Sequence, residues 1–182
     1  MNPRTQLLEA ALFSSAHPLS LTDLAALDPE ATLDDVRAAV DELREHYTAA
    51  EHGVELVEVA QGFQLLTRPE FAETIAAAQI VVRPRKLSAA ALETLAVIAY
   101  RQPVGRAEVE EIRGVAVDGV LKSLSDRGLV AVVGRGEGMG RPLLYGTTDV
   151  FLELLGLKGL DELPRLEELA VALRPLGEIE AP

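Results

Sequence analysis

"VVGRGEGMGRPLLYGTT", residues 132–148, is the stretch that decides the fold, because three kinds of structure use glycines in this density. They are a phosphate-binding loop, a flexible hinge and the wing of a winged-helix module. A phosphate loop needs glycines at fixed positions followed by the start of a helix. In the two registers of G-x-G-x-x-G that this stretch offers, the last glycine is replaced by Met139 or Arg141. The segment that follows has the composition of a strand, so spacing and context both argue against phosphate binding.

A wing accounts for more of the stretch. LVAVV, residues 129–133, and PLLYGTT, residues 142–148, are typical of two strands that flank a glycine-rich tip. Glycines supply the positive φ angles that a long hairpin loop needs, and Pro142 fits the first position of the returning strand. The sequence therefore predicts a β-hairpin whose loop carries Arg135 and Arg141.

The residues before this hairpin predict three helices. Ser88 is a candidate N-cap for a helix that Pro103 ends, Gly114 stops a short second helix, and Asp118 can cap a third helix that Gly128 closes. Each of the first two helices is expected to bury one apolar face. The stretch DVFLELLG, which follows the hairpin, predicts a closing helix. The apolar residues that define the two faces are Leu92, Leu95, Ala96, Ala99, Val109 and Ile112.

The first half of the chain repeats this order. Capping boxes at Ser20–Asp23 and Thr32–Asp35 predict a second and a third helix. VELVEVA and FQLLT around the dipeptide Gln61-Gly62 then predict a hairpin, and a helix follows. Pro18 and Pro103, which end the first helix of each half, lie 85 positions apart. The expected fold class is mainly α with small β-hairpins (α+β), as two tandem winged helix-turn-helix domains.

The predicted organisation has four parts. Residues 1–82 form an N-terminal winged-helix domain, 83–87 a linker, 88–164 a C-terminal winged-helix domain, and 165–182 an acidic tail to which we assign no role. Each module of about 80 residues is small enough to need support from its neighbour or from a partner.

Composition narrows the classes of function. The chain has 182 residues, no cysteine and a net charge of −12, so disulfides and thiolate metal sites are excluded. Its charge is uneven: residues 1–84 carry 5 basic and 14 acidic side chains, whereas residues 85–148 carry 9 basic and 7 acidic. The acidic majority should repel DNA, apart from the middle segment. With no long apolar run and no apolar signal core, we expect a cytoplasmic protein without membrane attachment.

Three long segments resemble one known family. They are LSAAALETLAVIAYRQPVGRAEVEEIRGV (residues 87–115), DGVLKSLSDRGLV (118–130) and VGRGEGMGRPLLYGTTDVFLELLGLKGLDELP (133–164). Together they resemble segregation and condensation protein B, the accessory subunit of bacterial condensin. Across residues 1–85 mainly the layout agrees. One departure is Gly105, where the family often has a Thr or Ser that would cap the second helix.

This resemblance implies two winged-helix domains and a homodimer formed largely through the first domains. It also implies binding to the central region of the kleisin subunit (segregation and condensation protein A type), which bridges the heads of an SMC ATPase. The implied function is therefore chromosome condensation and segregation at the nucleoid, with no enzymatic activity and no cofactor.

Candidate partner-binding residues gather in the second predicted domain. Part of this basic cluster could frame a groove for a partner segment, since Arg and Tyr are common anchors of interfaces. The alternative is a solvated surface with local ion pairs, such as Arg106 with Glu110. The candidates are Arg101, Gln102, Arg106, Arg135, Arg141, Leu144 and Tyr145.

The alternative function is a winged-helix DNA-binding transcription regulator. The third helix of the first domain is mostly acidic, and that of the second offers Lys122 and Arg127 beside Asp118 and Asp126. Neither pattern suits base recognition, so no direct sequence-specific DNA binding is expected. The three histidines lack the company of a metal site, and no serine has a local histidine that would activate it, so neither a metal site nor a catalytic site is predicted.

Overall fold

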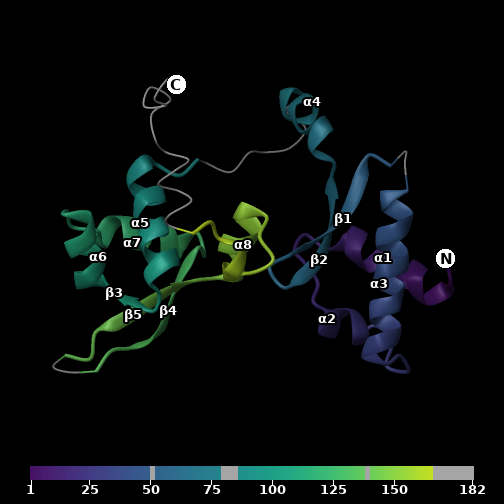
Figure 1. The fold of residues 1–182 in the computed structure, drawn as a ribbon, viewed down its shortest axis with the longest axis horizontal. Helices are drawn as coiled ribbons and strands as arrows, with labels where there is room; N and C mark the ends of the chain where they lie inside the picture. The colour runs from purple at the N-terminus through teal and green to yellow at the C-terminus, as the bar shows by residue number, and fades with distance from the viewer. Residues whose placement is uncertain (50–51, 79–85, 138–139, 166–182) are drawn as a thin grey trace, which may run out of the picture.

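The computed structural model describes residues 1–49, 52–78, 86–137 and 140–165. Its helices and strands form two successive units, each with its own hydrophobic core (Figure 1). This order confirms the predicted fold class of two tandem winged-helix units. The proposed domain boundaries remain predictions, since residues 83–85 of the linker and 166–182 of the tail lie outside the described residues.

The first unit packs two helices and a two-stranded sheet around the long third helix. Its core contains Leu8 and Leu12 of the first helix, Val36, Val40 and Leu43 of the third, and smaller contributions from the sheet. The elements are α1 (Pro3–Ser14), α2 (Leu21–Ala25), α3 (Leu33–Thr48), β1 (Val54–Val59), β2 (Gly62–Thr67), the 3-10 helix η1 (Pro69–Phe71) and α4 (Ala72–Ala77).

The second unit repeats this plan with one further strand. Its core is built from Leu95, Ile98, Leu121, Leu124 and Phe151, so aliphatic side chains dominate it. The elements are α5 (Ala89–Arg101), β3 (Val104–Gly105), α6 (Arg106–Arg113), α7 (Asp118–Asp126), β4 (Val130–Arg135), β5 (Leu143–Thr147), α8 (Asp149–Leu155) and the 3-10 helix η2 (Leu160–Glu162).

The predicted caps are confirmed with one exception. Both capping boxes form, and Ser88 accepts a hydrogen bond from the backbone N–H of Ala91. Asp118, which the sequence predicted as the cap of α7, is instead the first residue of that helix and binds Arg106. Glu110 of α6 takes over part of the capping, because its side chain accepts a hydrogen bond from the N–H of Val117. Arg106 therefore pairs across two helices with Asp118 and not, as expected, with Glu110 on its own helix.

The hairpin of the first unit turns one residue earlier than the sequence suggested. Val59 pairs with Gly62, and the two turn residues, Ala60 and Gln61, have φ angles of 47° and 59°. Gly62 is nevertheless needed, for a different reason: an added Cβ would lie 2.9 Å from the carbonyl carbon of Leu19. Leu19 forms an antiparallel bridge with Phe63 through two hydrogen bonds of 2.9 Å. The glycine thus admits a third backbone segment to the sheet.

In the second unit the same place is taken by β3, a strand too short for the sequence to reveal. The sheet order is β3-β5-β4, with Val104 opposite Tyr145 and Val132 on the other side of Tyr145. The register between β4 and β5 shifts between Val132 and Gly134, at the base of the wing. Two residues of the predicted wing tip, 138 and 139, lie outside the described residues.

The buried face of α5 differs from the expected one. Leu95 and Ala99 are buried as expected, but Ala91, Thr94 and Ile98 complete the buried face. Leu92 is 52 % exposed, and Ala96 is exposed as well. Thr94 can be buried because its hydroxyl donates to the carbonyl of Ala90, four residues earlier.

Gly105 is the N-cap of α6, and no side chain caps this helix. Its φ of −81° and ψ of 154° suit any L-residue, and an added Cβ would approach only Leu144, at 4.0 Å. We therefore expect Gly105→Ser to raise the free energy of unfolding by about 0.5 kcal/mol, through a new cap and a less flexible unfolded chain. Urea unfolding followed by circular dichroism measures this effect. A lower midpoint in the variant would contradict it.

Candidate partner-binding surface

The seven predicted site residues lie in three places of the second unit. Leu144 and Tyr145 on β5 lie opposite Gly105 and Val104, so Arg106 follows directly beside them. Arg135 and Arg141 are on the wing, where the Arg135 side chain reaches the carbonyl of Arg141 at 3.5 Å. Arg101 is exposed at the end of α5, next to Gln102.

Several of these side chains already have partners within the fold. The Gln102 amide nitrogen donates to Thr147 Oγ1 at 2.9 Å, and its oxygen accepts from the Thr147 N–H at 2.7 Å. Tyr145 is partly buried against the core. Arg106 is held by Asp118, and this hydrogen bond raises the pKa of its guanidinium. Arg101, Arg106, Arg135 and Arg141 are exposed, whereas Gln102, Leu144 and Tyr145 are partly buried.

Arg113, the last residue of α6, forms several contacts within the fold. Its side chain is only 13 % exposed. It binds Glu93 at 2.5 Å and also donates to the carbonyl of Ala90 and the hydroxyl of Thr94. Glu93, a carboxylate on an otherwise apolar helix, is explained by this pair. Arg113 thus joins α6 to α5 and is not available to a partner.

A groove that the sequence did not predict opens between the start of α5 and α8. It has a volume of about 990 Å³. Leu92 of α5 and Leu154 of α8 are both at least half exposed in it, at 52 % and 50 %. Soluble proteins seldom leave several large apolar side chains together in a concave surface without a ligand or a partner. Its apolar lining consists of Leu87, Leu92, Leu129, Val150, Leu154 and Leu155.

The rim of this groove is charged and mostly basic. Lys86 and Arg127 contribute positive charge, and Glu153 contributes one carboxylate. Glu153 lies 3.3 Å from His17 Nδ1 of the first unit. In a chain with a net charge of −12, this rim is a local basic site that favours an acidic or amphipathic partner segment. Leucines at helical spacing, as on α5 and α8, are typical of core positions, which is why the sequence alone does not identify the groove.

Two of the histidines lie close together. The ring centroids of His46 and His52 are 4.8 Å from each other, with Tyr47 beside both. Burial and a hydrogen bond to Glu9 raise the pKa of Tyr47 to about 12, so its hydroxyl remains a donor. Within the described residues no three His, Cys, Asp or Glu side chains gather as a metal site would require.

The third helix of each unit carries acidic side chains at its surface. On α3 the acidic side chains Asp34, Asp35 and Asp41 are exposed, and on α7 Lys122 is paired with Asp126 at 2.8 Å.

Among the described residues, no helix combines the length and the apolar character that crossing a membrane requires.

Comparisons with known proteins identify one family that matches most of the chain. The profile of the family described as "Segregation and condensation complex subunit ScpB" matches residues 6–166. Segregation and condensation protein B of Moorella thermoacetica is 52 % identical over 170 residues, covering 91 % of this chain and 84 % of that protein.

Two solved structures were also found. The crystal structure of ScpB from Mycobacterium tuberculosis is 38 % identical and covers 85 % of this chain and 95 % of that one, with a TM-score of 0.39. A crystal structure of a dimer of the ScpB N-terminal domain complexed with ScpA peptide is 31 % identical, with a TM-score of 0.39. It covers 42 % of this chain and 94 % of that one. From the family profile and the relative that matches nearly end to end, we conclude that this chain belongs to the family of segregation and condensation complex subunit ScpB.

Proposed function

We propose that this chain is a non-enzymatic accessory subunit of a bacterial chromosome condensation and segregation complex. It acts as a homodimer in the cytoplasm, binds the central region of the kleisin subunit, and influences the SMC ATPase through the kleisin. The observation that carries this proposal is the apolar groove of the second unit, in a chain that belongs to a family of complex subunits.

The groove fits a segment with apolar side chains along one face. Leu92, Val150 and Leu154 offer contacts that an amphipathic helix fills with residues at i, i+3 or i+4 and i+7. Acidic residues beside such a stripe would meet Lys86 at the rim. The wing, which carries Arg135 and Arg141, remains a second proposed contact; Figure 1 shows the β4–β5 hairpin reaching away from α8.

Binding of this kind would work through order and proximity. A flexible kleisin segment loses conformational entropy when it becomes ordered in the groove, and burial of its apolar side chains offsets that loss. A dimer offers two grooves to one assembly, which raises the local concentration of the second groove once the first is occupied. Because the bound segment is ordered, the distance that the kleisin can bridge between the SMC heads would be restricted.

Co-purification and isothermal titration with the central fragment of the kleisin test this function. We expect a complex that forms at micromolar concentrations and whose mass corresponds to a dimer of this chain with kleisin bound. A folded sample that shows no association at such concentrations would refute the proposal. A mobility-shift titration with duplex DNA distinguishes the alternative, because a transcription regulator would bind in a salt-sensitive and sequence-selective way.

The exposed side of α1 supports the homodimer. Phe13 is 83 % exposed, and Leu7 and Ala10 precede it on the same side at intervals of three residues. An apolar stripe of this kind is suited to contact with the same stripe of a second copy.

We expect Phe13→Asp to raise the dissociation constant of the dimer at least about tenfold, because it places a charge where an aromatic side chain would be buried. Light scattering across a dilution series measures the change. Phe71→Asp, at a less exposed phenylalanine remote from α1, is the matched control. An unchanged dimer in the Phe13 variant would place the interface elsewhere.

A further inference from the structure

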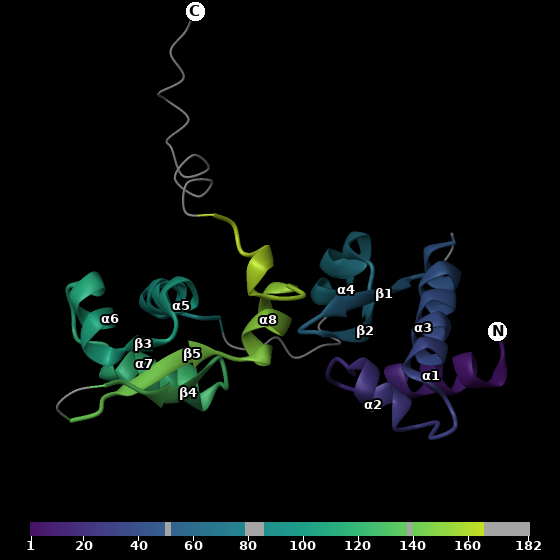
Figure 2. The ribbon, with the colours of Figure 1, turned by 60° about the horizontal axis from the view of Figure 1, so that its bottom comes forward.

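Among the described residues, the hairpin tip of the first unit contacts the second unit. The N–H of Ala60 donates to the carbonyl of Leu157 at 2.8 Å, and the N–H of Gln61 donates to the carbonyl of Lys158 at 3.1 Å. Ala60 also packs against the core of the second unit. Figure 2 shows α8 and the segment after it between the hairpin and the rest of the second unit.

Charged side chains flank these backbone contacts. Lys158 Nζ lies 3.4 Å from Glu58 Oε2 on β1. His17, which follows α1, lies 3.3 Å from Glu153 on α8. Both of these cross-unit pairs are at least partly exposed to solvent. The strip that receives the hairpin is itself held in shape, because the N–H of Lys158 donates to Glu162 at 2.7 Å and the Tyr100 hydroxyl donates to the carbonyl of Pro164.

We propose that these contacts form a releasable joint, which holds the two units in one relative orientation and opens without unfolding either unit. The buried residues of each core come from one unit, and the partly buried Ala60 of the first unit packs against the second core, so separation exposes Ala60 together with the hairpin tip and the receiving strip. The ion pairs of the joint are at least partly exposed, so charge changes and salt act directly on the equilibrium between docked and released states.

The joint has a consequence for the proposed binding site, and this consequence depends on the proposed function. The helix α8 lines the groove with Val150 and Leu154, and the chain reaches the joint two residues after it ends. Docking therefore fixes where the groove lies relative to the first unit. Release allows the groove to move relative to the dimer face on α1.

The distance between the units tests the joint directly. The chain has no cysteine, so Ala38→Cys on α3 and Ser123→Cys on α7, both exposed, accept spin labels at two chosen positions only. Labelled chain diluted with an excess of unlabelled chain reports distances within one protomer. Pulsed dipolar spectroscopy should give one narrow distance distribution for the otherwise unchanged chain.

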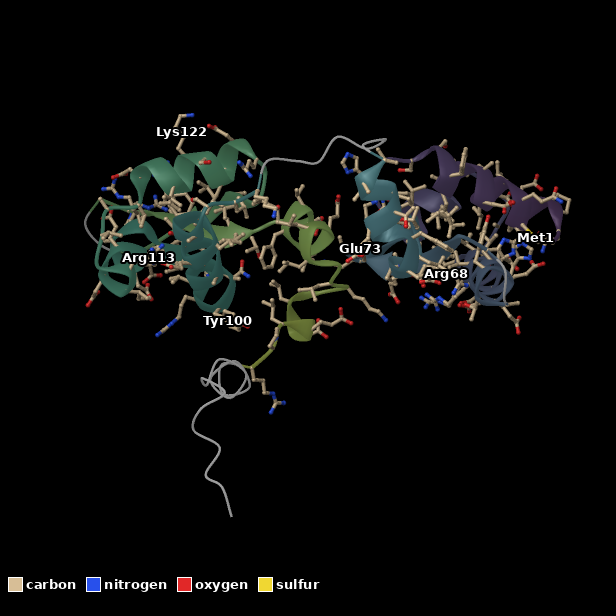
Figure 3. The ribbon with its side chains drawn as sticks, turned by 90° about the horizontal axis from the view of Figure 1, so that it is seen from above. Met1, Arg68, Glu73, Tyr100, Arg113 and Lys122 are labelled. Carbon is tan, nitrogen blue, oxygen red and sulfur yellow. The ribbon has the colours of Figure 1, made fainter. Side chains whose placement is uncertain are left out.

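Charge reversal at the joint supplies the decisive comparison. Lys158→Glu faces Glu58 with a like charge and should broaden the distribution several-fold in width, while Lys158→Gln, which removes the pair without repulsion and leaves the contact of Glu58 with Arg44 intact, should broaden it less. Lys122→Glu is the matched control, because Lys122 points into solvent (Figure 3) and pairs with Asp126 within its own helix. It should leave the distribution unchanged.

Two results would overturn the joint: a broad distribution in the chain that carries only the labels, or a Lys158→Glu variant whose distribution equals that of the Lys122→Glu control. Circular dichroism of each variant separates release from unfolding, since release leaves the helical signal intact. The measurement needs no kleisin. A failure of the joint is therefore distinguishable from a failure of the proposed function.

Discussion

Replacing Leu154 with glutamate is expected to weaken binding of the kleisin's central fragment by at least about thirtyfold, which corresponds to roughly 2 kcal/mol. The leucine side chain is half exposed in the apolar groove, so its replacement costs the second unit little stability. In a complex the same position would be covered, and a carboxylate buried there without a partner loses its hydration. Isothermal titration with the purified fragment measures the change.

Two variants make this result specific. Ile112→Glu changes a similarly exposed apolar residue on α6 outside the groove, and it should bind the fragment as tightly as the unchanged chain. Arg135→Glu tests the wing surface that the sequence predicted. If Arg135→Glu abolishes binding while Leu154→Glu does not, the wing and not the groove holds the kleisin. If the unchanged chain fails to bind, the proposed function itself is wrong.

Gly62→Ala is expected to lower the free energy of unfolding by about 2–3 kcal/mol. The added methyl group would lie 2.9 Å from the Leu19 carbonyl carbon and 3.0 Å from its oxygen. Backbone atoms cannot rotate away as a flexible side chain can. The bridge between Leu19 and Phe63 must therefore shift or break, and with it the connection that brings α1 to the sheet.

The same substitution at Gly119 is the matched control and should have the opposite sign. Gly119 lies in the first turn of α7, where an added Cβ meets nothing within 4 Å. Alanine there should stabilise the fold by about 0.5 kcal/mol through its higher helix propensity. Thermal or urea unfolding of both variants gives the comparison. If Gly62→Ala were as stable as Gly119→Ala, the Leu19 segment would adapt to the added methyl group at no cost, and the prediction would be wrong.

Interactions between residues that are close in the sequence predicted most of the fold. Both capping boxes, the Ser88 cap and the helix ends at Gly114 and Gly128 depend on residues within a few positions of each other, and all five form. Hairpin and helix order also followed from hydrophobic periodicity. The prediction failed where a residue's partner lies on another element, as when Asp118 binds Arg106 and leaves capping to Glu110.

The candidate site was harder to predict for the same reason. The helix α5 is apolar on nearly all sides, so periodicity could not decide whether Leu92 faces the core or solvent. Leucines of α8 likewise divide between core and groove: Leu152 is buried, and Leu154 is not. The amide of Gln102 is hydrogen-bonded to Thr147, which lies 45 positions away in the chain, and its contact with a partner stays a prediction.

The position of α8 between groove and joint bears on how genetic lesions in this chain are interpreted. A substitution in residues 149–158 can disturb recruitment of the partner, the placement of one half of the molecule relative to the other, or both. Alleles in this segment should therefore appear pleiotropic. Alleles at Leu92, which makes none of the cross-unit contacts described above, should show the recruitment defect alone, and such a pair of alleles would separate the two roles in a living cell.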